Sequence, residues 1–329
     1  MPSSRERSIE RIRQLLERAG FYVADTHAIR PTSFDLAARR DATLLLVKVL
    51  KNIDALDSEE ATRLRELGHL FPAITLVIGQ TSGASDLDPG VVYTRYGVSI
   101  INEETLQEFL EKALPPFLYA SPGGTFAQVD GPRLRQLRSE RGLSLGTLAS
   151  IAGVSRRAIQ LYEESAGAEA LVIERIETYL GETVVRPIGL FDWSARVRIE
   201  ADAEKAAQER EPTAERSLPR TGDALRDGVL RQLEGMGLDI TVTVRAPFDA
   251  LGRTPEILLA AVGSLRTALH RAEVLHGLAR VAEGHALFVV RDNVTRSAIA
   301  GLPILTVTEL RRHRDPDELI EEITEREGP

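Results

Sequence analysis

The alternation of apolar and polar residues divides the chain into four segments. In the first, which ends near Leu118, apolar residues recur at helical spacing ahead of Gly20, at Ile9, Ile12, Leu15 and Leu16. Three apolar runs then predict strands, FYVADTHAI, FDLAARR and TLLLVKVL, the last two as a hairpin. A helix over 58–70, a buried strand (AITLVIGQ), a short strand (GVSII) and a helix over 103–113 follow. This order predicts a mixed sheet flanked by helices.

The fourth segment, 224–329, repeats the pattern of the first. LRDGVLRQLEGMG matches IERIRQLLERAG, and a Phe-Asp pair precedes an apolar strand in both copies, at Phe34-Asp35 and Phe248-Asp249. A helix over 264–282, the strands ALFVV and LPILTV and a helix over 317–324 complete it. An internal duplication is the simplest explanation. The alternative is two unrelated mixed domains.

Between these copies lie two segments of different character. Pro115, Pro116 and the SPGG run predict a boundary, after which residues 130–181 have a purely helical pattern. Residues 182–223 are interpreted as a linker, because their second part is charged and poor in large apolar side chains. A solvated surface helix as far as residue 211 is the alternative. The unique tryptophan, in PIGLFDW, is expected to dock this linker onto a domain.

The composition excludes several kinds of catalytic and binding site. Cysteine is absent from the 329 residues, which excludes disulfides and thiol catalysis. The charged start MPSSRERSIERIRQ lacks the apolar core of a signal peptide, so we expect a soluble cytoplasmic protein. The six histidines show no metal-ligand spacing and no phosphate-binding glycine loop is present, so neither a metal nor a cofactor is expected.

Asp35 on one strand and Lys48 on the next resemble the restriction-endonuclease-like fold. Cleavage in that family needs a second carboxylate, two residues before the lysine, to help hold Mg²⁺. Leu46 stands at that position, and the second copy keeps Asp249 but has Ala261 in place of the lysine. We therefore expect degenerate remnants and no enzyme. Two alternatives remain. One is a residual site that uses Glu6, Glu10 or Glu17, and the other is a purely structural role in which Asp35 lies at the end of a strand and the Lys48 side chain reaches solvent.

The helical segment carries a tighter resemblance. PRLRQLRSERGLSLGTLASIAGVSRRAIQLYEE is similar to the helix-turn-helix of phage repressors and Cro, the XRE-like regulators. Ser144 and Ser155 are expected to cap the second and third helices, with the turn at Gly153. The resemblance places the core at Leu148, Ala149, Gly153, Val154, Ile159 and Tyr162. The family commonly has Gln where this chain has Leu145, which removes one phosphate contact.

This register predicts a DNA-reading face. Arginine can pair with guanine and glutamine with adenine in the major groove, and the base-reading residues are expected to be Ser155, Arg156, Arg157 and Gln160. Phosphate contacts are expected from Arg133, Arg135, Arg138, Ser144 and Thr147. Residues 132–160 hold six arginines and one acid, a net charge of +5 in a chain of net charge −8. The acids that follow, beginning with Glu163, are expected to face away from DNA.

The whole arrangement resembles archaeal transcriptional regulators in which an XRE-like helix-turn-helix lies between nuclease-like α/β modules. The resemblance implies modules at 1–118 and 224–329, a DNA-binding domain at 130–181 and a linker at 182–223. It also implies a homodimer on double-stranded DNA, with about 34 Å between reading helices, and leaves room for an unknown effector. The alternatives are a DNA-processing nuclease targeted by the helix-turn-helix and a protein-interaction scaffold.

Overall fold

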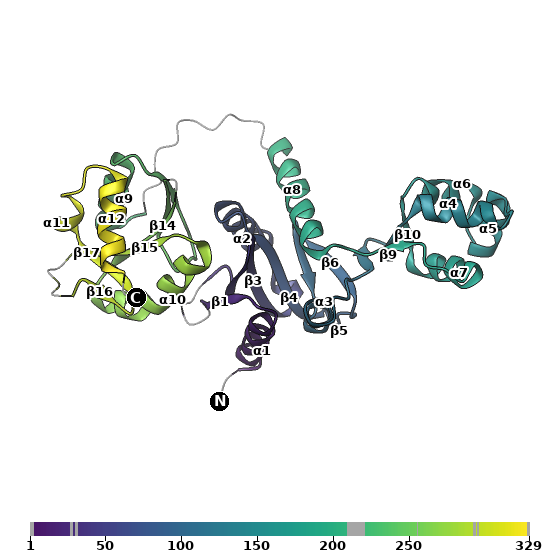
Figure 1. The fold of residues 1–329 in the computed structure, drawn as a ribbon, viewed down its shortest axis with the longest axis horizontal. Coiled ribbons are helices and arrows are strands. Elements are labelled where there is room, and N and C mark those ends of the chain that lie inside the picture. Colours follow the sequence, from purple (N-terminus) through teal and green to yellow (C-terminus); the bar gives the residue numbers. More distant parts are fainter. Residues whose placement is uncertain are drawn as a thin grey trace. The chain divides into compact units, whose positions relative to one another are not determined.

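The computed structural model describes residues 3–26, 29, 32–208, 221–254, 256–291, 294 and 296–327 (Figure 1). The chain divides into two compact units. The first comprises Met1–Val49, Thr62–Thr75 and Lys205–Pro329, and the second comprises Leu50–Ala61 and Leu76–Glu204. Each unit is described by itself.

The N-terminal part of the first unit begins with the predicted amphipathic helix. Helix α1 (Ser4–Arg18) begins at a capping box formed by Ser3 and Glu6, and it buries Ile9, Ile12, Leu15 and Leu16. Three antiparallel strands follow, β1 (Tyr22–Asp25), β2 (Leu36–Arg40) and β3 (Thr43–Asn52). The predicted β2–β3 hairpin is therefore confirmed. The first predicted strand is shorter, and its residues 27 and 28 lie outside the described ones.

The C-terminal module, residues 224–329, contains a complete mixed sheet in the order β12-β13-β14-β15-β17-β16. Strands β14, β15 and β17 are parallel, and the other neighbours are antiparallel. The elements in chain order are α9 (Ala224–Gly235), β12 (Asp239–Val242), β13 (Ala250–Arg253), β14 (Ile257–Gly263), α10 (Leu265–Ala282), β15 (His285–Val290), β16 (Ala298–Ile299), β17 (Leu302–Thr306), α11 (Val307–Leu310) and α12 (Pro316–Arg326). The predicted long helix and closing helix correspond to α10 and α12.

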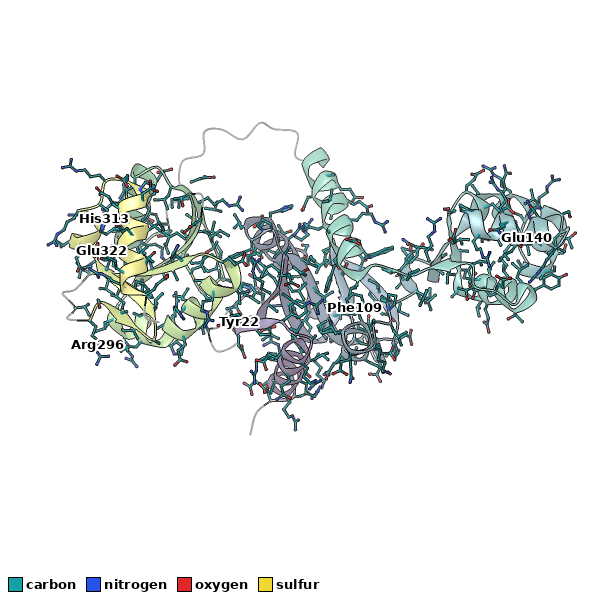
Figure 2. All side chains as sticks on the ribbon, viewed as in Figure 1. Tyr22, Phe109, Glu140, Arg296, His313 and Glu322 are labelled. Carbon is teal, nitrogen blue, oxygen red and sulfur yellow. The ribbon has the colours of Figure 1, made fainter. Side chains whose placement is uncertain are left out.

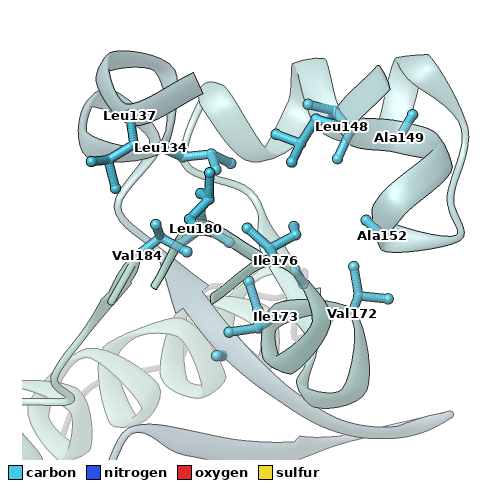
Figure 3. Packing of buried hydrophobic residues seen from close by; sticks show 14 residues of the cluster. Leu134, Leu137, Leu148, Ala149, Ala152, Val172, Ile173, Ile176, Leu180 and Val184 are labelled. Carbon is cyan, nitrogen blue, oxygen red and sulfur yellow. The ribbon is translucent and has the colours of Figure 1, made fainter. Parts of the chain in front are cut away.

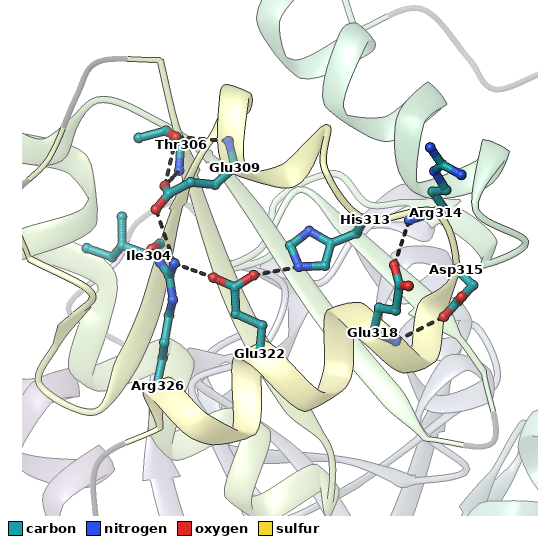
Figure 4. Close-up of polar contacts among 9 residues, drawn as sticks. All are labelled: Ile304, Thr306, Glu309, His313, Arg314, Asp315, Glu318, Glu322 and Arg326. Atoms are coloured by element: carbon teal, nitrogen blue, oxygen red, sulfur yellow. Dashed lines mark hydrogen bonds and ion pairs between the residues drawn. The ribbon is translucent and has the colours of Figure 1, made fainter.

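A polar network fixes the last helices of this module (Figure 4). Thr306 and Glu309 form the capping box of α11. Arg326 from α12 donates to the Ile304 carbonyl at 2.6 Å and to Glu309 at 3.1 Å. Glu322 pairs with Arg326 and lies 2.5 Å from His313 Nε2. The C-terminal helix is thus bound to the strand that precedes α11.

The second unit contains the rest of the first predicted sheet. Strands β4 (Ile74–Ser82) and β7 (Val98–Ile101) are parallel, and β6 (Val91–Arg95) runs antiparallel to β7. The remaining elements are the short helix η1 (Ile53–Ala55), strand β5 (Ser85–Asp86) and α3 (Glu103–Glu111). Helix α2 (Ser58–Leu70) begins in this unit, and its part from Thr62 onward belongs to the first unit. The predicted strands AITLVIGQ and GVSII are confirmed as β4 and β7.

The SPGG run is a hairpin turn rather than a boundary. It joins β8 (Leu118–Ser121) to β9 (Gly124–Val129), and Gly123 and Gly124 adopt φ values of +101° and +143°, which favour glycine. Strand β8 pairs with β6. Strand β9 also pairs with β10 (Gly167–Glu169) and β11 (Val185–Arg186), so the segment expected to be purely helical contains a strand.

A helix occupies most of the expected linker. Helix α8 (Leu190–Gln208) agrees with the surface-helix alternative as far as it is described, and residues 209–220 lie outside the described ones. Its start is docked as predicted: Phe191 packs edge-on against Phe109 of α3, which Figure 2 labels, with ring centroids 5.2 Å apart. Trp193 lies 5.1 Å from the ring of Tyr119. Across the described residues, no helix combines the length and apolar character needed to cross a membrane.

Candidate nucleic-acid interface

Four helices with short connections form the module that follows β9. They are α4 (Gly131–Glu140), α5 (Leu145–Ala152), α6 (Arg156–Glu163) and α7 (Ala170–Leu180). Their apolar side chains converge on one core (Figure 3), which contains Leu134, Leu137, Leu148, Ile159, Ile173 and Ile176. Each of the first three helices begins at a side-chain cap, from Asp130, Ser144 and Ser155 respectively.

The connection between α5 and α6 is a tight turn at Gly153. This residue adopts φ +73° and ψ +31°, the left-handed conformation that glycine accepts without a steric cost. A Cβ there would lie 2.8 Å from Nη1 of Arg175, which donates to the Ala152 carbonyl at 3.2 Å. Arg175 of α7 therefore supports the end of α5. Its role was not foreseen, because it depends on a contact 23 positions away in the sequence.

The residues expected in the helix-turn-helix core lie where the sequence register put them. Leu148, Ala149 and Ile159 are buried. Val154 and Tyr162 are half-buried and pack against the same core. Burial of Tyr162 raises the pKa of its phenol. Leu145, at the position commonly held by glutamine, also packs against the core, so its apolar side chain has a structural use.

The expected base-reading residues share one exposed face at the start of α6. Ser155 caps the helix by accepting a hydrogen bond from the Ala158 amide at 3.1 Å. Ser155, Arg156, Arg157 and Gln160 are all exposed. Within the described part of the chain, neither Arg156 nor Arg157 forms an ion pair or a side-chain hydrogen bond. Two guanidinium groups and an amide are therefore free to contact a ligand.

The expected phosphate-binding arginines are more engaged. Arg138 is only 16% exposed, and its guanidinium binds Glu163 at 2.5 Å and the Leu143 carbonyl at 2.8 Å. Arg135 is 58% exposed and lies 3.3 Å from Glu163, and Arg133 pairs with Glu182. Glu163 is buried and links α6 to α4 through these pairs. The expectation that it faces away from DNA stays a prediction.

The remaining two phosphate candidates belong to the cap of α5. The Ser144 hydroxyl accepts from the Thr147 amide at 3.0 Å and lies 2.8 Å from the Thr147 hydroxyl. Both residues are exposed.

The cap of α4 is charged. A hydrogen bond from Arg186, together with one from the Arg133 amide, lowers the pKa of the capping residue Asp130.

The nuclease-like carboxylates have a different environment. Asp35 is 2% exposed, and Arg5 of α1 donates to its two oxygens at 2.7 and 2.8 Å. The Val49 amide donates to Asp35 Oδ2 at 2.8 Å. The acid is thus bound to a cation from α1 and to the next strand. Sequence reasoning missed Arg5, because nothing local links it to Asp35.

The second copy repeats this arrangement. Arg226 of α9 lies 2.9 Å from Asp249, and the Val262 amide donates to Asp249 Oδ2 at 2.7 Å. The backbone around the acid matches as well: the Asp35 amide donates to Val47 and the Asp249 amide to Ala260. These matched contacts are what a duplicated module predicts, and they align Lys48 with Ala261.

The other expected nuclease remnants do not assemble a metal site. Lys48 is 3% exposed and donates to the Thr32 carbonyl at 3.4 Å, so the reading in which it reaches solvent is wrong. Leu46 is fully buried. A Mg²⁺ ion needs several oxygen ligands, but Arg5 already occupies both oxygens of Asp35. The residues present therefore do not fit Mg²⁺, and no group of three or more metal-binding side chains occurs among the described residues.

The acids of α1 that could have formed a residual site serve the helix itself. Glu6 completes the capping box with Ser3. Glu10 and Glu17 both pair with Arg13, at 2.6 and 2.7 Å. Both acids therefore share the guanidinium of Arg13 along one face of α1.

Comparison with known proteins found one family model and several relatives of similar length. A family model described as "PD-(D/E)XK superfamily domain" matches residues 5–115. A protein of Halorubrum lacusprofundi is 36% identical over 98% of both chains, and one of Natronomonas pharaonis is 35% identical over 98% of this chain and 99% of its own. One of Methanosarcina acetivorans is 33% identical over 98% of both chains.

These three relatives carry the name "Putative HTH-type transcriptional regulatory protein". No solved structure matches the chain. Because the identity exceeds 30% across nearly the whole of both chains, the similarity is not confined to the nuclease-like part. The chain therefore belongs to the family of these archaeal HTH-type transcriptional regulatory proteins and carries a PD-(D/E)XK superfamily domain at residues 5–115.

Proposed function

We propose that the chain is a sequence-specific DNA-binding regulator of transcription whose α5-turn-α6 unit is a Cro/phage-repressor-type helix-turn-helix. The observation that carries this proposal is the exposed start of α6, where Arg156, Arg157 and Gln160 stand free beside a capped helix N-terminus. The names of the relatives agree with it.

The chemistry of that face suits the major groove. An arginine donates two parallel hydrogen bonds to the O6 and N7 atoms of guanine, and a glutamine pairs with the N6 and N7 atoms of adenine. In helix-turn-helix proteins the N-terminal residues of the third helix reach these base edges. Arg156, Arg157 and Gln160 are the base-reading residues of this proposal, with Ser155 at the first position of the face.

Phosphate binding is assigned to the more exposed polar groups around α4 and α5. Arg133 and Arg135 remain candidates, because each is more than a third exposed despite an acidic partner. Ser144 and Thr147 offer hydroxyls at the start of α5. Arg138 is instead a positioning residue, because its guanidinium donates to Glu163 and to the Leu143 carbonyl.

We further propose that neither nuclease-like module cleaves nucleic acid. Both acids are paired with arginines, Asp35 with Arg5 and Asp249 with Arg226. A nuclease targeted by the helix-turn-helix is the second candidate function, favoured by the match of residues 5–115 to the PD-(D/E)XK superfamily. Incubation with plasmid and Mg²⁺ or Mn²⁺ separates the two. Cleavage that Asp35→Ala abolishes supports the nuclease and contradicts this proposal.

The experiment that tests DNA reading begins with duplexes selected by the full chain from a random-sequence pool. Binding of a selected duplex should weaken steeply between about 50 and 200 mM salt. Arg157→Ala should lose about 1–3 kcal/mol of discrimination against a base change in the site. Arg311→Ala, an exposed arginine of the C-terminal module, is the matched control and should behave as wild type. No binding in low salt would leave the interaction scaffold as the better reading.

We also propose that the chain acts as a homodimer, with room for an unknown effector. A two-fold pair of chains would place two α6 helices about 34 Å apart on a palindromic site. Sedimentation of the chain with one duplex, at stoichiometric concentrations, gives the number of chains bound.

A further inference from the structure

Two arginines make reciprocal contacts inside the first unit. Arg39 of β2 donates through Nε to the Val281 carbonyl in the last turn of α10, at 2.5 Å. Arg253 of β13 donates to the Leu70 carbonyl at the end of α2, also at 2.5 Å. Each arginine belongs to one nuclease-like region, and each carbonyl belongs to the other.

The strand register shows that the two arginines are equivalent. Arg39 lies opposite Tyr22 at the first position of β1, and Arg253 lies opposite Asp239 at the first position of β12. Counted from the paired acids, each is four residues downstream, of Asp35 and of Asp249 respectively. The two contacts therefore have the relation i-to-j and j-to-i that defines an isologous, two-fold interface.

In both contacts the donor also suits the acceptor, because a guanidinium meets a carbonyl at the C-terminal end of a helix. The last carbonyls of a helix have no partner within the helix and carry a partial negative charge. A guanidinium from the opposite region satisfies one of them in α10 and one in α2. On one side the arginine gains a further partner, since Arg39 also pairs with Glu283 at 3.0 Å.

Close packing accompanies these hydrogen bonds. A Cβ placed on Gly277 of α10 would lie 3.5 Å from the Cβ of Ala24 in β1, so the helix and the strand are in van der Waals contact. Phe71 packs edge-on against Phe248, with ring centroids 5.7 Å apart, and both are buried. The guanidinium of Arg280 lies 4.6 Å from the ring centre of Tyr22.

We propose that the nuclease-like regions form a two-fold pair within one chain, in which the C-terminal module occupies the surface that a second copy of the N-terminal region would otherwise use. The surface consists of β1, β2 and the end of α2 on one side and of β12, β13 and α10 on the other. A dimer of chains then has to form through a different surface. This inference does not depend on DNA binding.

A designed disulfide tests the pairing in the full chain. The chain has no cysteine, so Ala24→Cys with Gly277→Cys introduces the two thiols alone. A Cβ separation of 3.5 Å lies at the short end of the range that disulfides accept. Under oxidised glutathione we expect a single-chain product that is lighter by two hydrogen atoms and migrates faster on a non-reducing gel.

The control is Ala24→Cys with Leu269→Cys. Leu269 is exposed on α10, two turns before Gly277 and about 12 Å along the helix. This variant should stay reduced or form only concentration-dependent dimers. For the test pair, a covalent two-chain product would assign the contact to neighbouring molecules and overturn the proposal. Free thiols in a chain with unchanged circular dichroism would overturn it as well.

Discussion

Arginines serve opposite purposes in two regions of this protein. In the two α/β regions, Arg5 and Arg226 are bound to buried aspartates, and Arg39 and Arg253 hold helix ends. On α6, Arg156 and Arg157 are exposed and have no protein partner among the described residues. Residue type alone therefore does not identify a binding surface. Exposure and pairing together do, because a guanidinium that is both largely buried and held by a carboxylate has few donors left for a phosphate or a base, whereas Arg135 is paired but 58% exposed.

The largest expected effect comes from removing a buried acid. Asp35→Ala leaves Arg5 without its carboxylate and the Val49 amide without an acceptor. We expect a loss of about 3 kcal/mol in the free energy of unfolding, since breaking one partner of a buried pair is strongly destabilising. DNA affinity should be unchanged at temperatures where the variant is folded. Denaturant unfolding measures the first quantity and fluorescence anisotropy the second.

Glu321→Ala, which removes an exposed acid of α12, is the control for that experiment. Equal stability of wild type and Asp35→Ala would erase the distinction between structural and free arginines. Asp249→Ala should reproduce the loss in the second copy.

A sharper comparison lies within the helical module, between Arg138 and Arg135. Arg138→Ala removes the closer partner of the buried Glu163 and should cost about 2 kcal/mol of stability. Arg135→Ala should leave stability nearly unchanged. It should weaken binding to all DNA sequences alike and reduce the slope of log affinity against log salt by about one. If Arg135→Ala instead proves the more destabilising, the assignment of the two arginines is reversed.

The reciprocal arginines are expected to have smaller effects. Arg39→Ala and Arg253→Ala should each lower the free energy of unfolding by about 1 kcal/mol, because each removes a charged hydrogen bond at a partly exposed site. Arg39→Ala should be the worse of the two, since it also loses Glu283. Thermal unfolding beside Arg311→Ala provides the comparison. Wild-type stability for both variants would mean that the helix ends do not need these donors.

The smallest effect concerns acidification. The hydrogen bond from Arg186 lowers the pKa of Asp130 in the folded chain, so folding favours its ionised form. That contribution is present above the carboxyl's unfolded pKa of about 3.9 and is lost as pH falls through the lower folded value. Asp130→Asn should therefore be less stable than wild type at neutral pH, with the difference shrinking below about pH 4. If the difference in stability stays constant across this pH range, the charge of Asp130 does not contribute to stability.

The sequence predicted the helices and caps of the helical module well, because those signals are local. Ser144, Gly153 and Ser155 each act within four residues of their own position. The pairing of β9 with β8 and β10 was missed, since strands of three to six residues are too short to show a reliable alternation.

Contacts between distant positions were also out of reach. Arg5 and Asp35 are 30 residues apart, and Arg39 and Val281 are 242 apart. The burial of Glu163 was not foreseen for a related reason: helical periodicity treats a charged residue as exposed, although a half-buried guanidinium from another helix can hold it inside. Local patterns thus located the candidate reading face but not the arginines that are unavailable to it.

Strand β9 ends at Val129 and α4 begins at Gly131, so Asp130 alone separates them, and it is fixed at once by the α4 amide it caps and by Arg186. Because a single residue is held from two sides, this junction cannot absorb a change in length. Adding or deleting a residue there would rotate the first turn of α4 by roughly 100° about its axis and so re-aim every helix that packs on it. We therefore regard this junction as the element that fixes the orientation of α6 relative to β9. Insertions and deletions at this position should be rare among related chains.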